Sequence, residues 1–139
     1  MSKLKIALII VAVIVVAIQF IPVRRTNPPV TANLDAPMEV VSVFKKSCYD
    51  CHSNETEWPW YSYIAPVSWL VSSDVKDGRL HLNFSKWGNF SRKDIAKMKE
   101  EIWEEIERGK MPLGKYIFMH PEAELDQEKK DLIKEWAGE

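Results

Sequence analysis

Five consecutive residues constrain this chain more than any other feature. They read Cys48-Tyr49-Asp50-Cys51-His52, and the two cysteines of the chain both lie within them. Two thiols three positions apart can each add to one vinyl group of a haem, which gives two thioether bonds. The imidazole of His52 is then placed to bind the iron from the proximal side. The pattern therefore predicts one covalently attached haem of the c type.

Other chemistries use similar cysteine pairs. A structural zinc site usually has four ligands, often from two such pairs, whereas this chain has no second pair and His81 and His120 lie far along the sequence. A thioredoxin-like redox pair is expected in a strand-helix-strand context, and no such pattern surrounds the motif. A plain disulfide between Cys48 and Cys51 remains an alternative for an exported domain.

A long apolar run opens the chain. Residues 6–23 are almost wholly apolar, with Gln19 and Pro22 as the interruptions. About 20 apolar residues span a bilayer, and no small-x-small cleavage site of a signal peptide follows the run. The sequence therefore predicts an uncleaved transmembrane helix, and residues 1–23 are interpreted as an N-terminal membrane anchor.

The flanking charges do not orient this segment, because Lys3 and Lys5 stand on one side and Arg24 and Arg25 on the other. The haem motif supplies the orientation, since c-type haem is attached on the outer face of the bacterial membrane. We therefore expect a single-pass protein of the bacterial inner membrane with its C-terminal domain in the periplasm. The helix could also make the protein a subunit of a larger membrane complex.

The remaining chain divides into a linker and a domain. Residues 24–34 contain Asn27-Pro28-Pro29, which favours an extended, Pro-rich linker. Residues 35–139 form the expected c-type haem-binding domain, with 15 basic and 20 acidic residues and a net charge of −5. An acidic domain is a poor nucleic-acid binder; the charge could suit a basic docking partner, and a solvated surface explains it equally well. The haem motif leads us to expect redox proteins as partners.

Hydrophobic periodicity predicts a mostly helical domain. The first helix is expected to begin near Asp35 and to end in the haem motif. The second helix is expected to end at Gly78. Arg79 and His81, in the loop that should follow, are candidates for binding haem propionates or for surface roles. The four helices are expected at residues 35–48, 64–78, 91–109 and 126–137.

The sixth iron ligand has several candidates. Met111 follows Gly109, the expected end of the third helix, and directly precedes Pro112. A short loop of this kind can hold a thioether against the iron, and thioether ligation is a standard haem arrangement. We therefore favour Met111 as the distal ligand over His120 and His81. Met98 lies on the apolar stripe of a helix, which favours a packing role.

Several stretches resemble a known family. The resemblance spans residues 35–137 and is to the bacterial haem-binding domain family of small, membrane-anchored c-type cytochromes. The order of the parts is also similar to that of class I cytochrome c, with a terminal helix crossing the first. The stretches are Cys48-Tyr49-Asp50-Cys51-His52-Ser53-Asn54, Trp58-Pro59-Trp60-Tyr61, Ile64-Ala65-Pro66-Val67-Ser68-Trp69, His81-Leu82-Asn83-Phe84-Ser85 and Met111-Pro112-Leu113.

The resemblance implies haem c ligated by His52 and Met111 in a cytochrome c-like helical fold. Together with the motif it predicts a membrane-anchored monohaem cytochrome that carries single electrons in a respiratory or periplasmic redox chain. The alternative is a haem-based sensor or small-ligand binder with an open or displaceable sixth position. No distal acid-base pair of the kind a peroxidase needs is evident, so we expect no enzymatic activity.

Overall fold

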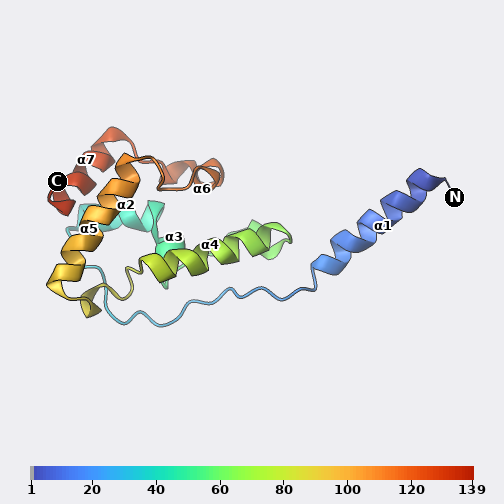
Figure 1. Ribbon diagram of the computed structural model, residues 1–139, viewed down its shortest axis with the longest axis horizontal. Helices are drawn as coiled ribbons and strands as arrows, with labels where there is room; N and C mark the ends of the chain where they lie inside the picture. Colours follow the sequence, from blue (N-terminus) through green and yellow to red (C-terminus); the bar gives the residue numbers. More distant parts are fainter. Residues whose placement is uncertain (1) are drawn as a thin grey trace.

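Helices make up most of the computed structural model, which describes residues 2–139. Figure 1 shows α1 standing apart at one end, joined to the other helices by a long extended segment. The predicted mostly helical fold is confirmed. The elements are α1 (Lys3–Ile18), α2 (Met38–Ser47), α3 (Tyr49–His52), α4 (Val67–His81), α5 (Arg92–Glu107), α6 (Gly114–Met119) and α7 (Gln127–Ala137), with 3-10 turns η1 (Trp60–Tyr63), η2 (Trp87–Asn89) and η3 (Pro121–Ala123).

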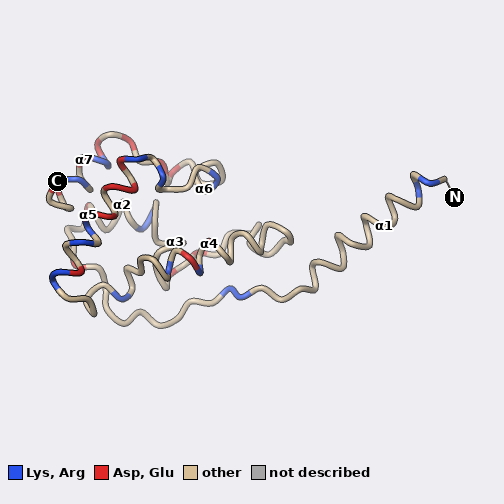
Figure 2. The backbone as a smooth tube through the Cα atoms, in the orientation of Figure 1, with Lys and Arg blue, Asp and Glu red and all other residues tan. Residues whose placement is uncertain are grey.

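The apolar helix α1 is shorter than predicted. Its 16 residues rise about 24 Å at 1.5 Å per residue, against about 30 Å for the hydrocarbon core of a bilayer. The helix cannot continue regularly past Ile18, because Pro22 has no backbone N–H to donate to the Ile18 carbonyl. The Gln19 Nε2 donates to the Val15 and Ala65 carbonyls, and its Oε1 accepts from the Ala65 amide. Figure 2 shows no charged residue between Lys5 and Arg24.

Across residues 2–139, no helix combines the length and the apolar character that crossing a membrane requires. The predicted transmembrane helix over residues 6–23 is therefore wrong, and so is the single-pass inner-membrane localisation that was derived from it. The composition of the run was read correctly, but its helical part stops before Gln19 and Pro22.

The segment from residue 24 to residue 34 is extended and is hydrogen-bonded along the domain. The Arg25 guanidinium donates to the Ser62 carbonyl, and the Asn27 amide donates to the Thr56 carbonyl. Farther along, the Ala32 backbone N–H donates to the Ser85 carbonyl at 3.0 Å. The segment also accepts from α4, through the Ser72 hydroxyl and the Arg79 guanidinium, so it lies along α4 and the loops on either side of it (Figure 1).

The core lies where α2, α5 and α7 meet. Phe44 of α2 is fully buried; its ring stacks on Phe84 with centroids 5.0 Å apart and meets the edge of Trp136 of α7 at 5.2 Å. Ile133 of α7 and Trp87 are also buried in this cluster. Aromatic pairs of this geometry add stability beyond the area they bury. The cluster fixes α2, whose end carries the haem motif.

The predicted starts of two helices are confirmed, because a side chain next to each helix caps it. The Ser91 hydroxyl accepts from the Asp94 amide at the start of α5, and Asp126 caps α7 in the same way through the Lys129 amide. Elsewhere the boundaries moved. Helix α2 begins at Met38, after Pro37. Helix α4 begins and ends three residues later than predicted, so Gly78 lies inside it.

Candidate functional site

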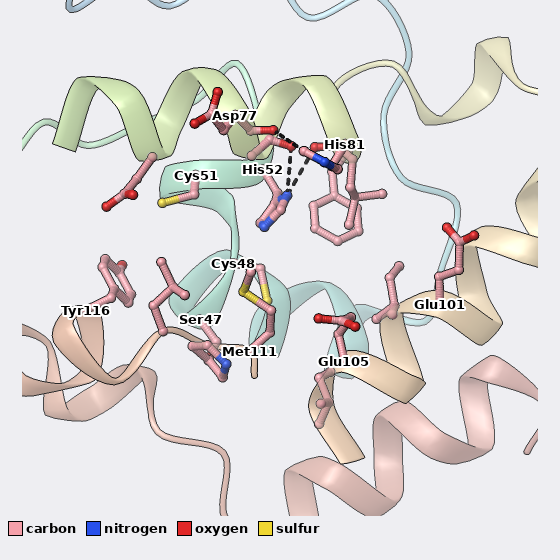
Figure 3. A pocket seen from close by; sticks show the side chains of 18 of the residues that line it. Ser47, Cys48, Cys51, His52, Asp77, His81, Glu101, Glu105, Met111 and Tyr116 are labelled. Atoms are coloured by element: carbon pink, nitrogen blue, oxygen red, sulfur yellow. Dashed lines mark hydrogen bonds between the residues drawn. The ribbon is translucent and has the colours of Figure 1, made fainter. Parts of the chain in front are cut away.

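A cavity of about 650 Å³ separates two walls of the domain. Figure 3 shows α3 and α4 on one side and α5 with the segment leading to α6 on the other. Cys48, Cys51, His52 and Met111 all line this cavity. Its volume is within the range of about 300–1,000 Å³ that is usual for ligand and cofactor sites. The structure thus brings residues 63 positions apart in the chain to one site.

The two cysteines face this cavity as free thiols. Cys48 follows α2, and its carbonyl accepts from the backbone N–H groups of Cys51 and His52 at 3.2 and 2.9 Å, so the motif forms one tight turn. Burial raises the pKa of each thiol to about 12. Reactive redox cysteines have lowered pKa values instead. Both cysteines are free, and the direction of their pKa shifts is opposite to that of a reactive redox pair.

The His52 ring is held at one edge, through Nδ1. Its Nδ1 lies 3.0 Å from the Gly78 carbonyl and 3.2 Å from the Leu82 carbonyl. Two carbonyls can only accept, so Nδ1 carries the proton and Nε2 of the neutral ring keeps a free lone pair. Burial, the largest influence, lowers the pKa of His52 below its ordinary value, which favours this neutral form. Nε2 points into the cavity (Figure 3).

Gly78 lets α4 approach the motif closely enough to supply that carbonyl. A Cβ at this position would lie 2.5 Å from the Cys51 carbonyl oxygen and 3.1 Å from the Cys51 Cβ. Side chains do not tolerate such distances, so glycine is required here for packing. The sequence predicts Gly78 at a helix end, whereas Gly78 lies inside α4 and lets α4 pack against α3.

Met111 reaches the cavity because α5 ends in a tight reversal. Gly109 has a φ of +66°, the left-handed conformation that commonly ends helices. The amides of Lys110 and Met111 both donate to the Glu105 carbonyl, at 2.9 and 3.1 Å. This turns the chain back across the end of α5, and the partly buried Met111 side chain lines the cavity.

The other candidate ligands differ in their surroundings. His120 does not line the cavity: its Nε2 lies 2.7 Å from the Tyr61 hydroxyl, and its Nδ1 lies 3.2 Å from Glu122. His81 does line it, with Nδ1 bonded to the Asp77 carbonyl at 2.8 Å, but the residue is exposed. Met98 lines the wall that α5 contributes.

The charged residues on the cavity wall are mainly acidic. Among the described residues that line it, no lysine or arginine is present. Arg79, a candidate for binding propionates, instead donates to the Ser53 and Thr26 carbonyls and to the Thr56 hydroxyl, outside the cavity. The acidic lining residues are Asp74, Asp77, Glu101, Glu104 and Glu105.

Part of this wall comes from one side of α5. The side chains of Glu101 and Glu105 are 57% and 38% exposed, and they share one side of α5 with Met98 and Ile102 at helical spacing. That spacing was the available signal. Trp60, in the aromatic stretch, is 70% exposed and does not line the cavity.

An imidazole nitrogen and a thioether sulfur are ligands of haem iron, and two thiols beside them suit attachment to the haem vinyl groups. Among residues 2–139, no cluster of three or more His, Cys, Asp or Glu residues is placed to hold a bare metal ion. Fold and cavity together define a small helical haem protein.

The haem-binding domain family model matches residues 13–139, and the chain belongs to that family. Neither the curated proteins nor the solved structures contain a significant match. The predicted family is thereby confirmed, and a haem cofactor is shown at the level of the family.

Proposed function

We propose that this protein is a monohaem c-type cytochrome that carries single electrons between redox proteins. The observation that carries the proposal is the single cavity that joins both motif cysteines, the free Nε2 of His52 and the Met111 side chain. Bound haem would supply an iron that alternates between two oxidation states. The chain would supply the attachment, the ligands and a wall that limits water.

Cys48 and Cys51 are proposed to attach the haem. Each S–H adds across one vinyl group: a carbon–sulfur bond forms, the thiol hydrogen goes to the other vinyl carbon, and no electrons are lost. Both thiols are protonated at neutral pH, because burial raises their pKa values to about 12. Their separation by one turn of backbone matches two vinyl groups of one macrocycle.

His52 and Met111 are proposed as the proximal and distal ligands. The carbonyls of Gly78 and Leu82 fix the ring of His52, and such outer contacts set both tautomer and orientation of a ligating histidine. Methionine raises the haem potential relative to a second histidine. The acidic wall acts in the opposite sense, because negative charge favours the more positive, oxidised iron.

Haem staining after denaturing electrophoresis tests the attachment. The wild-type polypeptide should carry the stain, and the Cys48→Ser, Cys51→Ser double variant should not. His120→Ala is the matched control, because His120 lies outside the cavity, and it should stain as the wild type does. Stained haem in the double variant would refute covalent attachment.

The second candidate function, a small-ligand sensor, is favoured by one observation: α6, which follows Met111, buries none of its residues. Carbon monoxide separates the two functions. A stable six-coordinate carrier resists the gas when reduced, whereas rapid and complete binding at low gas concentration would make the sensor the better proposal.

A further inference from the structure

Helix α6 closes one side of the cavity without contributing to the core. None of its six residues is buried, and its Phe118 is 83% exposed. A segment with few buried apolar contacts opens at low cost. Met111 lies shortly before α6, so a contact that holds α6 also restrains Met111, in addition to the backbone hydrogen bond from Met111 to Glu105.

Polar side-chain contacts hold α6 across the cavity. The Tyr116 hydroxyl donates to Asp50 Oδ2 at 2.8 Å, and Lys115 Nζ pairs with Asp74 Oδ2 at 2.7 Å. Asp50 lies inside the haem motif and Asp74 lies on α4, so both contacts join the two walls. Lys115 is well exposed, and exposed ion pairs contribute little.

The hydrogen bond of Tyr116 is the stronger contact. Its acceptor is a carboxylate, and hydrogen bonds to charged groups are stronger than neutral ones. Burial, followed by the bond to Asp50, raises the pKa of Tyr116, so the hydroxyl remains a donor throughout the physiological range. The ring also stacks on His120 with centroids 4.5 Å apart, which orients it.

We propose that Tyr116 is a positioning residue for the sixth iron ligand: its bond to Asp50 latches α6 to the haem motif and keeps Met111 against the cavity. Breaking the latch frees the sixth position for a small neutral ligand. The inference rests on the proposed function, because it takes Met111 as the distal ligand.

Imidazole binding to the oxidised, haem-loaded full chain tests the latch. The rate should saturate at high imidazole, where departure of Met111 limits it. Tyr116→Phe keeps the ring stack and removes only the hydroxyl. We expect the saturating rate to rise about tenfold, which corresponds to about 1.4 kcal/mol. In an Asp50→Ala background the same substitution should change the rate less than twofold.

Amide hydrogen exchange gives a readout that does not depend on the iron. Exchange within residues 113–119 should accelerate in Tyr116→Phe, while exchange in α7 should not change. Tyr63→Phe is the matched control, because Tyr63 is 59% exposed and its ring lies at Arg25, away from the cavity. It should match the wild type in both measurements.

The outcomes separate the two proposals. If Met111→Ala leaves the wild-type spectrum unchanged, Met111 is not the ligand. The inference about Tyr116 is then refuted together with that part of the proposed function. If Met111→Ala changes the spectrum but Tyr116→Phe binds imidazole at the wild-type rate, only the latch is wrong. Equal acceleration by Tyr116→Phe with and without Asp50 would also overturn it.

Discussion

Gly78→Ala should perturb the haem site, although Gly78 does not contact the atoms that are proposed to bind the iron. The new Cβ would lie 2.5 Å from the Cys51 carbonyl oxygen, whereas ordinary contact begins at 3.4 Å. The nearest atoms belong to backbone, which cannot rotate away. Helix α4 must therefore move from α3 by close to an ångström, and this lengthens the 3.0 Å contact between His52 Nδ1 and the Gly78 carbonyl.

The expected loss of stability combines three effects. Overpacking costs about 1–3 kcal/mol, and a weakened hydrogen bond costs about 1 kcal/mol. Replacing glycine by alanine within a helix stabilises the folded state by about 1 kcal/mol. The net destabilisation is about 2 kcal/mol, which lowers the Tm of a domain of this size by roughly 10 °C.

Thermal unfolding of the haem-loaded protein measures this change. Gly114→Ala is the matched control, because a Cβ there meets nothing within 4 Å and the residue also lies in a helix; its Tm should equal or exceed that of the wild type. The absorption spectrum of Gly78→Ala should also report a perturbed His52 ligand. A Tm within 2 °C of the wild type, with an unchanged spectrum, would refute the close-packing role of Gly78.

Three further outcomes are expected. On acidification the His52–iron bond should survive at pH 6.5 and break only at lower pH, because burial lowers the pKa of His52 below its ordinary value of 6.5 and iron competes for Nε2; a spectral midpoint at or above pH 6.5 would contradict this. Ile133→Ala, at a fully buried core position, should cost about 2–5 kcal/mol by denaturant titration, whereas Ile64→Ala, at a residue 47% exposed, should cost much less. Ser91→Ala should cost about 1 kcal/mol in the same assay through loss of the α5 cap, and an unchanged midpoint would count against that cap.

The N-terminal run shows how a correct pattern led to a wrong structure. Its apolar composition satisfies the rule for a membrane span, but the rule counts residues and does not see where a helix stops. The Gln19 side chain bonds to the backbone of Ala65, a residue 46 positions away. Residue spacing gives no sign of that contact, whereas Pro22 is a local signal that limits the helix, because it cannot donate a backbone N–H.

Sequence alone determined the features that depend on neighbours along the chain. The spacing of Cys48, Cys51 and His52 fixes their common turn, and Ser91 and Asp126 cap their helices through amides three residues away. Tertiary structure decided the rest, because the remaining features depend on distant groups. Gly78 became a contact surface only when α4 met α3, and Tyr116 acquired its role only when α6 crossed to Asp50. Hydrogen bonds and close packing between segments far apart in the chain depend on the fold, so they cannot be predicted from the spacing of residues.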